Sequence, residues 1–121
     1  MAASTAVTII AELTGLGKLQ EFAEKFTITA TPTRALYQYD IQDVADTAQA
    51  LDVGDVGTIE LIIIKCVSND VDIDTSFDTT FSAEIELQEG EITVFKPTGT
   101  VYIKNDDDGE VSTFEYLVIG S

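Results

Sequence analysis

The chain has 121 residues, of which 45% are apolar, and its 22 acidic and six basic residues give a formal charge of −16 at pH 7. This length and apolar content predict one folded domain, residues 1–121, that buries a hydrophobic core of its own. A field of that sign repels nucleic acid phosphates and anionic lipid headgroups, so we expect no direct binding of nucleic acid or membrane.

The first third of the chain favours strands, with one irregular stretch. "TAVTIIAELTG" (5–15) and "KFTITATPT" (25–33) are rich in β-branched residues and predict strands. "LGKLQEFAE" (16–24) lies between them and is compatible with a short helix or with a continued strand. "RALYQYDIQ" (34–42) alternates and is aromatic, which predicts a further strand. We expect residues 1–20 to form an interface arm or an edge strand.

A polar loop around a short strand at residues 50–53 precedes the most apolar block, "LIIIKCV" (61–67). Both faces of this block are apolar apart from Lys65, which predicts a central strand covered on both sides. In an antiparallel sandwich only one face of a strand meets the core. The second face therefore needs a cover from another segment or from another subunit.

The second half alternates with a period of two, as expected for strands with one solvated face. "QEG" at Gln88–Gly90 predicts a hairpin turn between the strands on either side, and the later strands follow as a meander. We therefore predict an all-β fold, a single antiparallel β-sandwich of eight or nine strands that is jelly-roll-like. The strands expected here are "SAEIELQ" (82–88), "EITVFKP" (91–97), "GTVYIKN" (99–105) and "VSTFEYLVIG" (111–120).

Two acidic stretches raise the question of a calcium site. Asp70, Asp72 and Asp74 alternate, so their carboxylates project to one side of a strand, but the glycine and the later glutamate of an EF-hand loop are missing. We favour the alternative in which Val71 and Ile73 face inward and the aspartates face water.

The second acidic stretch is "NDDDGEVSTFE" (105–115). Asp106, Asp108 and Glu115 match EF-hand spacing, but Lys104 stands at the first ligand position and the flanks alternate as strands. We therefore interpret the stretch as a charged hairpin tip. The sequence predicts no metal site.

The residues also argue against catalysis. The chain has no histidine, and its single cysteine, Cys66, lies in the apolar block, where an inert buried thiol is expected. The chain contains no phosphate-binding glycine loop and no nucleophile elbow. We predict that the protein is not an enzyme, with no catalytic residue and no cofactor. Tyr37, Tyr39 and Phe114 are the aromatic residues from which a sugar-binding platform could be built.

Several segments carry a resemblance to a known group of proteins. "ALDVGDV" (50–56), "LIIIKC" (61–66), "LQEGEITVFKP" (87–97) and "EYLVIG" (115–120) are similar to strand and turn signatures of small virion proteins of tailed bacteriophages. Cys66 stands where asparagine is common in that group. The resemblance covers about two thirds of the chain, and none of its motifs is chemically specific. It implies a structural part of a phage particle without an attached activity.

The resemblance sets the functional expectation, which is a non-enzymatic virion structural protein, with capsid decoration or cement as the favoured role. The alternatives are a tail, neck or baseplate component and a carbohydrate- or cell-surface-binding module. We expect a multicopy or homo-oligomeric protein, made in the host cytoplasm, whose partners are other virion proteins, above all the major capsid protein. The expected interface residues are the apolar ones of the N-terminal strand and the central block: Val7, Ile9, Ile10, Leu61, Ile62, Ile63 and Ile64.

Overall fold

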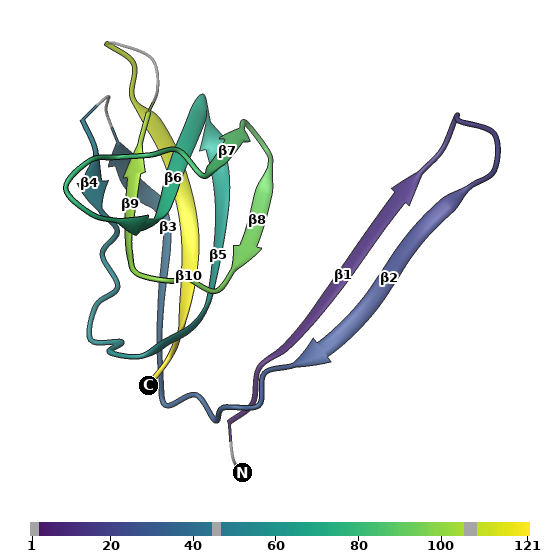
Figure 1. Ribbon diagram of the computed structural model, residues 1–121, viewed down its shortest axis with the longest axis horizontal. Helices are drawn as coiled ribbons and strands as arrows, with labels where there is room; N and C mark the ends of the chain where they lie inside the picture. Colours follow the sequence, from purple (N-terminus) through teal and green to yellow (C-terminus); the bar gives the residue numbers. More distant parts are fainter. Residues whose placement is uncertain (1–2, 45–46, 106–108) are drawn as a thin grey trace.

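The computed structural model describes residues 3–44, 47–105 and 109–121, with the backbone alone for residues 37–44 (Figure 1). No helix in these residues is long and apolar enough to cross a membrane. The strands are β1 (Ala6–Leu13), β2 (Gln20–Thr27), β3 (Arg34–Val44), β4 (Gln49–Ala50), β5 (Ile59–Ser68), β6 (Asp70–Phe77), β7 (Ile85–Gln88), β8 (Ile92–Phe95), β9 (Thr100–Lys104) and β10 (Ser112–Gly120).

Three antiparallel sheets account for all ten strands. β1 and β2 form a two-stranded sheet, which we call the arm. The other strands form the body, which has two four-stranded sheets: sheet I, in the order β3-β10-β5-β8, and sheet II, in the order β4-β9-β6-β7. The predicted all-β, antiparallel fold class is confirmed, and the two sheets of the body are arranged like a sandwich.

The order of pairing in the body follows a simple rule. β3 pairs with β10, β4 with β9, β5 with β8 and β6 with β7. The first four strands of the body thus pair with the last four in reverse chain order. The eight strands of the body therefore form one long antiparallel ribbon. The ribbon is wound so that its successive strand pairs lie alternately in sheet I and sheet II.

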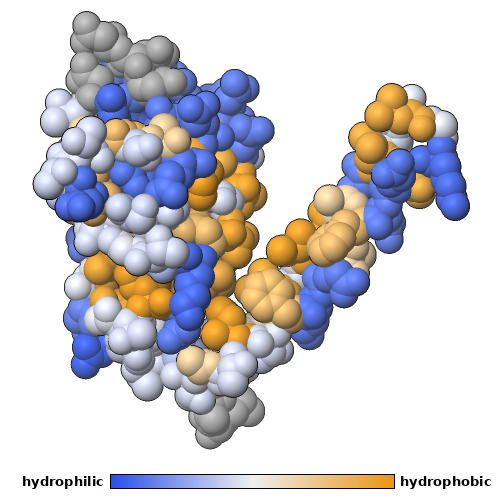
Figure 2. Space-filling model, in the orientation of Figure 1, coloured by the Kyte–Doolittle hydropathy of each residue, from blue (hydrophilic) through white to orange (hydrophobic). Residues whose placement is uncertain are grey.

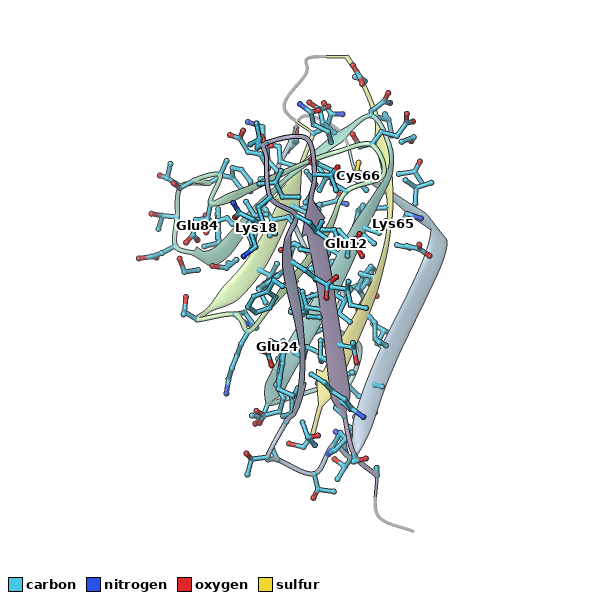
Figure 3. The ribbon with its side chains drawn as sticks, turned by 90° about the vertical axis from the view of Figure 1, so that its right-hand side faces the viewer. Glu12, Lys18, Glu24, Lys65, Cys66 and Glu84 are labelled. Carbon is cyan, nitrogen blue, oxygen red and sulfur yellow. The ribbon has the colours of Figure 1, made fainter. Side chains whose placement is uncertain are left out.

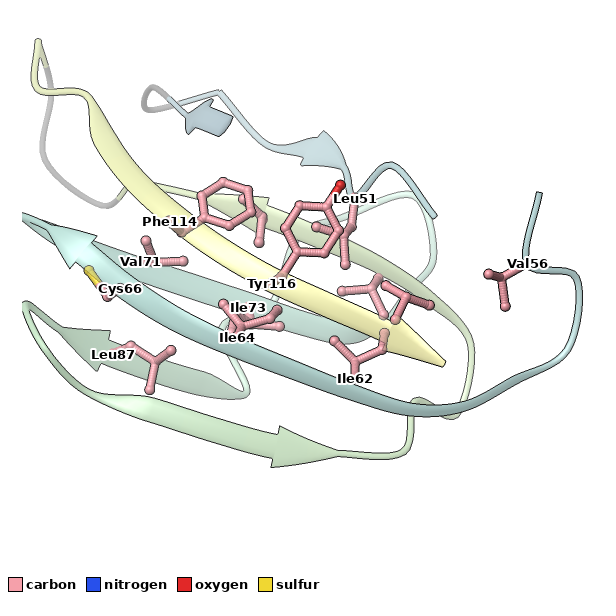
Figure 4. Close-up of a cluster of buried hydrophobic side chains, with 13 residues drawn as sticks. Leu51, Val56, Ile62, Ile64, Cys66, Val71, Ile73, Leu87, Phe114 and Tyr116 are labelled. Carbon is pink, nitrogen blue, oxygen red and sulfur yellow. The ribbon is translucent and has the colours of Figure 1, made fainter. Parts of the chain in front are cut away.

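The core lies between the two sheets (Figure 4). In β10, buried Phe114, Tyr116 and Val118 alternate with half-buried residues, because successive side chains of a strand point to opposite faces. β6 contributes Val71 and Ile73, which confirms their predicted inward orientation. The core cluster consists of Leu51, Val56, Ile62, Ile64, Cys66, Val71, Ile73, Leu87, Val101, Ile103, Phe114, Tyr116 and Val118.

Polar groups inside the body are hydrogen-bonded. Buried Asn105 donates to the hydroxyl of Ser112, which in turn donates to the carbonyl of Asp70. The Tyr116 hydroxyl donates to the carbonyl of Asp52 at 2.6 Å. Among the described residues, no buried side-chain nitrogen or oxygen lacks a partner. The interior therefore avoids the penalty of an unsatisfied polar group.

The structure corrects two local predictions. Gln88–Gly90 does form a turn, in which the Glu91 amide donates to the Gln88 carbonyl at 2.9 Å. However, the strands on either side of it, β7 and β8, belong to different sheets, so they do not form a hairpin and the second half is not a meander. The strand predicted over residues 25–33 ends at Thr27, and residues 28–33 connect the arm to the body.

Candidate interaction surface

The arm has one apolar and one polar face. The register pairs Val7 with Phe26 and Ala11 with Phe22, so these side chains share a face. We call it the apolar arm face, and its apolar residues are Val7, Ile9, Ala11, Leu13, Phe22 and Phe26. The same face also carries Gln20, opposite Leu13, and one charged residue, Glu24, opposite Ile9. The other face carries Thr8, Lys25, Glu12 and Glu21, together with Ile10 and Ala23.

Most of the apolar arm face is open to solvent. Phe22 exposes 56% of its surface and Ile9 exposes 39%, and only Val7, near the base, is buried. Leu16 and Leu19 in the connecting loop are also exposed. A two-stranded hairpin is marginally stable alone, and soluble monomers rarely expose apolar residues contiguously. The exposed apolar arm face is therefore the feature of this molecule that most requires a partner.

A second apolar surface lies on the side of sheet I that faces away from the core. Leu117 of β10 is aligned with Ile63 of β5, and Ile63 is aligned with Val94 of β8. Aligned residues of neighbouring strands share a face of the sheet. We call this surface the outer sheet face, and it consists of Leu61, Ile63, Ile92, Val94, Leu117 and Ile119. Three of its members, Ile63, Ile92 and Leu117, line a groove of about 190 Å³.

The two apolar surfaces meet only at the base of the arm. There Ile9 and Phe26 line a groove of about 390 Å³ whose other wall includes Leu61, Val94 and Phe95. From the base the arm runs away from the body, so that the gap widens towards its tip (Figure 1). Seen from the side of the arm, β1 and β2 lie in front of β5 and β10 (Figure 3). Apolar surface lines both sides of the gap (Figure 2).

Charge separates the arm from the body. Residues 6–27 hold three acidic and two basic residues, so the arm carries −1 and the rest of the chain carries −15. On the outer sheet face Lys65 lies beside Glu115 at 4.0 Å, and nearby Lys96 lies 3.3 Å from Glu60. The near-neutral arm can approach another acidic surface with much less repulsion than the body can.

The predicted interface divides between these surfaces and the core. Ile9 and Ile10 lie on the arm and are exposed, on opposite faces. Ile63 lies on the outer sheet face and is half-buried. Val7 and Leu61 also belong to these surfaces, but both are buried at the arm base. Ile62 and Ile64 need correction, because they are fully buried in the core.

The structure also assigns to the surface residues that the sequence did not single out. Phe22 and Phe26 lie in a stretch whose spacing of four fits a helix as well as a strand, so its face could not be assigned. In a strand, the even spacing of Phe22 and Phe26 places both on one side, which was the only available signal. Only the pairing with β1 fixes which side.

We predicted that both faces of the strand that is now β5 are covered, and the structure covers only one of them completely. β5 lies between β10 and β8, as expected for a central strand. Its inner face contacts the core, and the arm base covers Leu61 on the other face. Ile63 remains half-buried, so the arm of the same chain leaves part of the outer sheet face without a cover.

The acidic stretch on β6 has a structural role. The expectation that its aspartates face water is wrong for Asp72 and Asp74, because both are buried and Asp74 exposes only 2% of its surface. Asp74 accepts hydrogen bonds from the amides of Ser76 at 3.0 Å and Ser82 at 2.9 Å. Burial alone would raise its pKa, but these amides and a hydrogen bond with Glu84 hold the pKa of Asp74 below its usual value.

Asp74 thereby secures the connection between β6 and β7 to sheet II. No group of three or more carboxylate or thiol side chains in the described ranges is placed to hold a metal ion. Asp106 and Asp108, which belong to the second acidic stretch, lie outside the described residues.

One of the three aromatic residues considered for a sugar-binding platform is not available for that role. Phe114 is 1% exposed and packs in the core beside Tyr116, with ring centroids 5.6 Å apart. It cannot offer a ring face to a sugar. The side chains of Tyr37 and Tyr39 lie outside the described residues.

We expect Cys66 to react slowly with thiol reagents. Its side chain is fully buried and lies 3.2 Å from the carbonyl of Asn69, to which the thiol donates. Burial, and next the negative charges of Asp70, Glu89 and Glu91, raise the pKa of Cys66 to about 11. Because the thiolate is the reactive form, labelling of the native protein at pH 8 should be at least about 100-fold slower than in denaturant. A native rate within a few-fold of the denatured rate would contradict this burial.

Comparison of the chain with protein-family models, curated proteins and solved structures found no match.

Proposed function

We propose that the protein is a non-enzymatic structural component of a tailed-bacteriophage particle, present in many copies and acting as a decoration or cement protein of the capsid. The observation that carries the proposal is the solvent-exposed apolar arm face, which extends from an otherwise compact body. A protein that assembles with others needs a surface of this kind. It is exposed in the free subunit and becomes buried when the subunit is incorporated into the particle.

The body has the features of a rigid platform for such an arm. Its pairing order supports a jelly-roll topology, in which two wound sheets enclose one core. The segments that resemble phage virion proteins correspond to β4 with the loop after it, β5, the β7–β8 turn region and β10. All of them lie in the body. The arm is then the element that connects the platform to its surroundings.

The charge distribution supports a position on the outside of a particle. With −15 outside the arm, the body is repelled by nucleic acid, so packaged genome is a poor neighbour. Many weak contacts made at once by a repeated small domain strengthen the surface on which it sits. The proposed neighbours are other virion proteins, above all the major capsid protein.

The test is the occupancy of the protein in purified particles, and two adjacent isoleucines provide a matched pair of variants. Ile9 lies on the apolar arm face, whereas Ile10, which exposes 65% of its surface, lies on the opposite face. An aspartate buried at the interface by Ile9→Asp should lower occupancy at least about tenfold, since 1.4 kcal/mol of lost affinity is sufficient for that. Ile10→Asp should leave occupancy within about twofold.

Salt provides the second measurement on the same particles. Apolar attachment weakens little at 1 M salt, where charge interactions are screened beyond roughly 3 Å. Wild-type protein should therefore remain on washed particles. Particles that do not contain the protein, or that lose it in molar salt while Ile9→Asp has no effect, would overturn the proposed function.

A further inference from the structure

We propose that the apolar arm face of one copy packs on the outer sheet face of a second copy, in a reciprocal exchange between the two. This inference rests on the proposed assembly role and names the partner that covers the arm. The exchange would bury both kinds of apolar surface at once, because every copy has one apolar arm face and one outer sheet face.

The two surfaces already face each other at the arm base. Ile9 and Phe26 already face Leu61 and Val94 across the groove there. The residues farther along the same arm face, including Leu13 and Phe22, continue this apolar strip to the tip, where the gap is open. A second copy's sheet extends the contact that begins at the base. The strip and the surface that it would cover are thus continuous with packing already present in the molecule.

The dimensions of the two surfaces agree. The eight residues of β1 span about 26 Å at ~3.3 Å per residue, which is close to the lengths of β10 and β5, the two central strands of sheet I, with nine and ten residues. A two-stranded arm laid on a four-stranded sheet is an ordinary sheet-on-sheet contact, with the two layers about 10 Å apart.

The buried area favours exchange in both directions. The exposed parts of Ile9, Leu13, Phe22 and Phe26 amount to roughly 400 Å², taking ~200 Å² for each free side chain. One arm on one sheet therefore buries about 800 Å² in total, which is as small as a crystal-packing contact. The reciprocal pair buries about 1,600 Å², the size of a stable specific interface.

Charge gives the association a characteristic salt dependence. Two bodies of −15 each repel one another, while the arms between them are almost neutral. Glu24, the charged residue of the apolar arm face, would lie on a surface that contains Lys65. Salt that screens the repulsion of the bodies should strengthen self-association. A separate basic partner would show the opposite dependence.

The experiment measures self-association of the purified full chain by sedimentation, over a range of concentrations and at two salt concentrations. The wild type should form dimers whose Kd decreases with salt. Phe22→Asp on the arm and Ile92→Asp on the outer sheet face should each raise the Kd at least tenfold. Both positions are exposed, at 56% and 59%, so folding is preserved. Ile10→Asp, on the other face of the arm, is the control and should leave the Kd unchanged.

Mixing the two weakened variants distinguishes arm-to-sheet packing from arm-to-arm packing. Ile92→Asp retains an intact arm, and Phe22→Asp retains an intact sheet, so a mixed dimer contains one undamaged interface. The mixture should therefore associate more tightly than either variant alone. If Ile92→Asp dimerises like the wild type, or if mixing restores nothing, arm-to-sheet exchange is wrong.

The outcomes also separate this inference from the proposed function. A wild-type chain that stays monomeric at millimolar concentration would overturn the exchange, whether its arm folds back on its own sheet or binds a different protein. Normal occupancy of particles by that same chain would leave the assembly role intact. If the chain forms these dimers in solution but is not incorporated into particles, the exchange is supported and the proposed assembly role is wrong.

Discussion

Replacing Gly120 with alanine is expected to lower the free energy of unfolding by about 3 kcal/mol, the upper part of the range for overpacked sites. Gly120 is buried at the end of β10, and a Cβ there would lie 1.9 Å from the carbonyl oxygen of Thr58. Thr58 cannot move away easily, because its backbone exchanges two hydrogen bonds with Ser121, each 2.9 Å long. The β10–β5 contact must open for the methyl group to fit.

Thermal unfolding measures this effect, and Gly57 provides a control in the same region. The Gly120→Ala variant should melt about 10 °C below the wild type for a domain of this size. A Cβ at Gly57 meets only the Ser121 carbonyl oxygen, at 3.5 Å, an ordinary contact. Gly57→Ala should therefore change stability by less than about 1 kcal/mol. Equal melting temperatures for the two variants would show that β10 does not approach Thr58 this closely.

The second large effect is expected at Tyr116, one of the two largest fully buried side chains. Tyr116→Ala should lower the free energy of unfolding by about 4 kcal/mol, because it leaves a cavity of aromatic size between the sheets. Tyr116→Phe keeps the ring and removes only the hydrogen bond to Asp52, so about 1 kcal/mol should be lost. Denaturant unfolding of both variants separates ring packing from the anchoring of the Asp52 loop. Similar losses for the two would contradict a packing role.

The same pair gives a pH dependence with a defined sign. Burial, and next the charge of Asp52, raise the pKa of Tyr116 to about 12, above the value near 10 of an unfolded tyrosine. The resulting stabilisation is fully present below pH ~10 and is lost as the pH rises towards 12. Wild-type stability should therefore fall more steeply than that of Tyr116→Phe in this window. Parallel alkaline curves would mean that the phenol is accessible to solvent in the folded state.

The prediction of a central strand at residues 61–67 succeeded because local composition and burial agree there. A run of β-branched and aliphatic residues has few ways to leave water other than a strand with both faces covered. β5 is a central strand between β10 and β8, with its inner face in the core and its outer face partly covered. The prediction of the interface from the same run was wrong for Ile62 and Ile64, since periodicity does not state which face meets the core of the chain itself.

The turn at Gln88–Gly90 and the aspartates of β6 show which features local sequence patterns cannot predict. Turn residues specify a reversal of direction, but the sheet that each flanking strand joins depends on its pairing with β5 or β6, between 12 and 33 residues earlier in the chain. In the same way, alternation placed Asp74 on the outward face of its strand. The connection to β7 then covers that face, through amides that no local pattern could assign.

The sequence by itself determined that the chain is an acidic, all-β protein, because composition and a period of two depend only on neighbouring residues. Its alternation also determined that Val71 and Ile73 of β6 point inward. Only the tertiary structure decided that β1 pairs with β2 in an arm outside the sandwich, and that Phe22 and Phe26 join Ile9 on one exposed face. The physical reason is that strand pairing and burial are set by contacts between distant segments, and the same apolar pattern fits a core strand and an uncovered arm equally well.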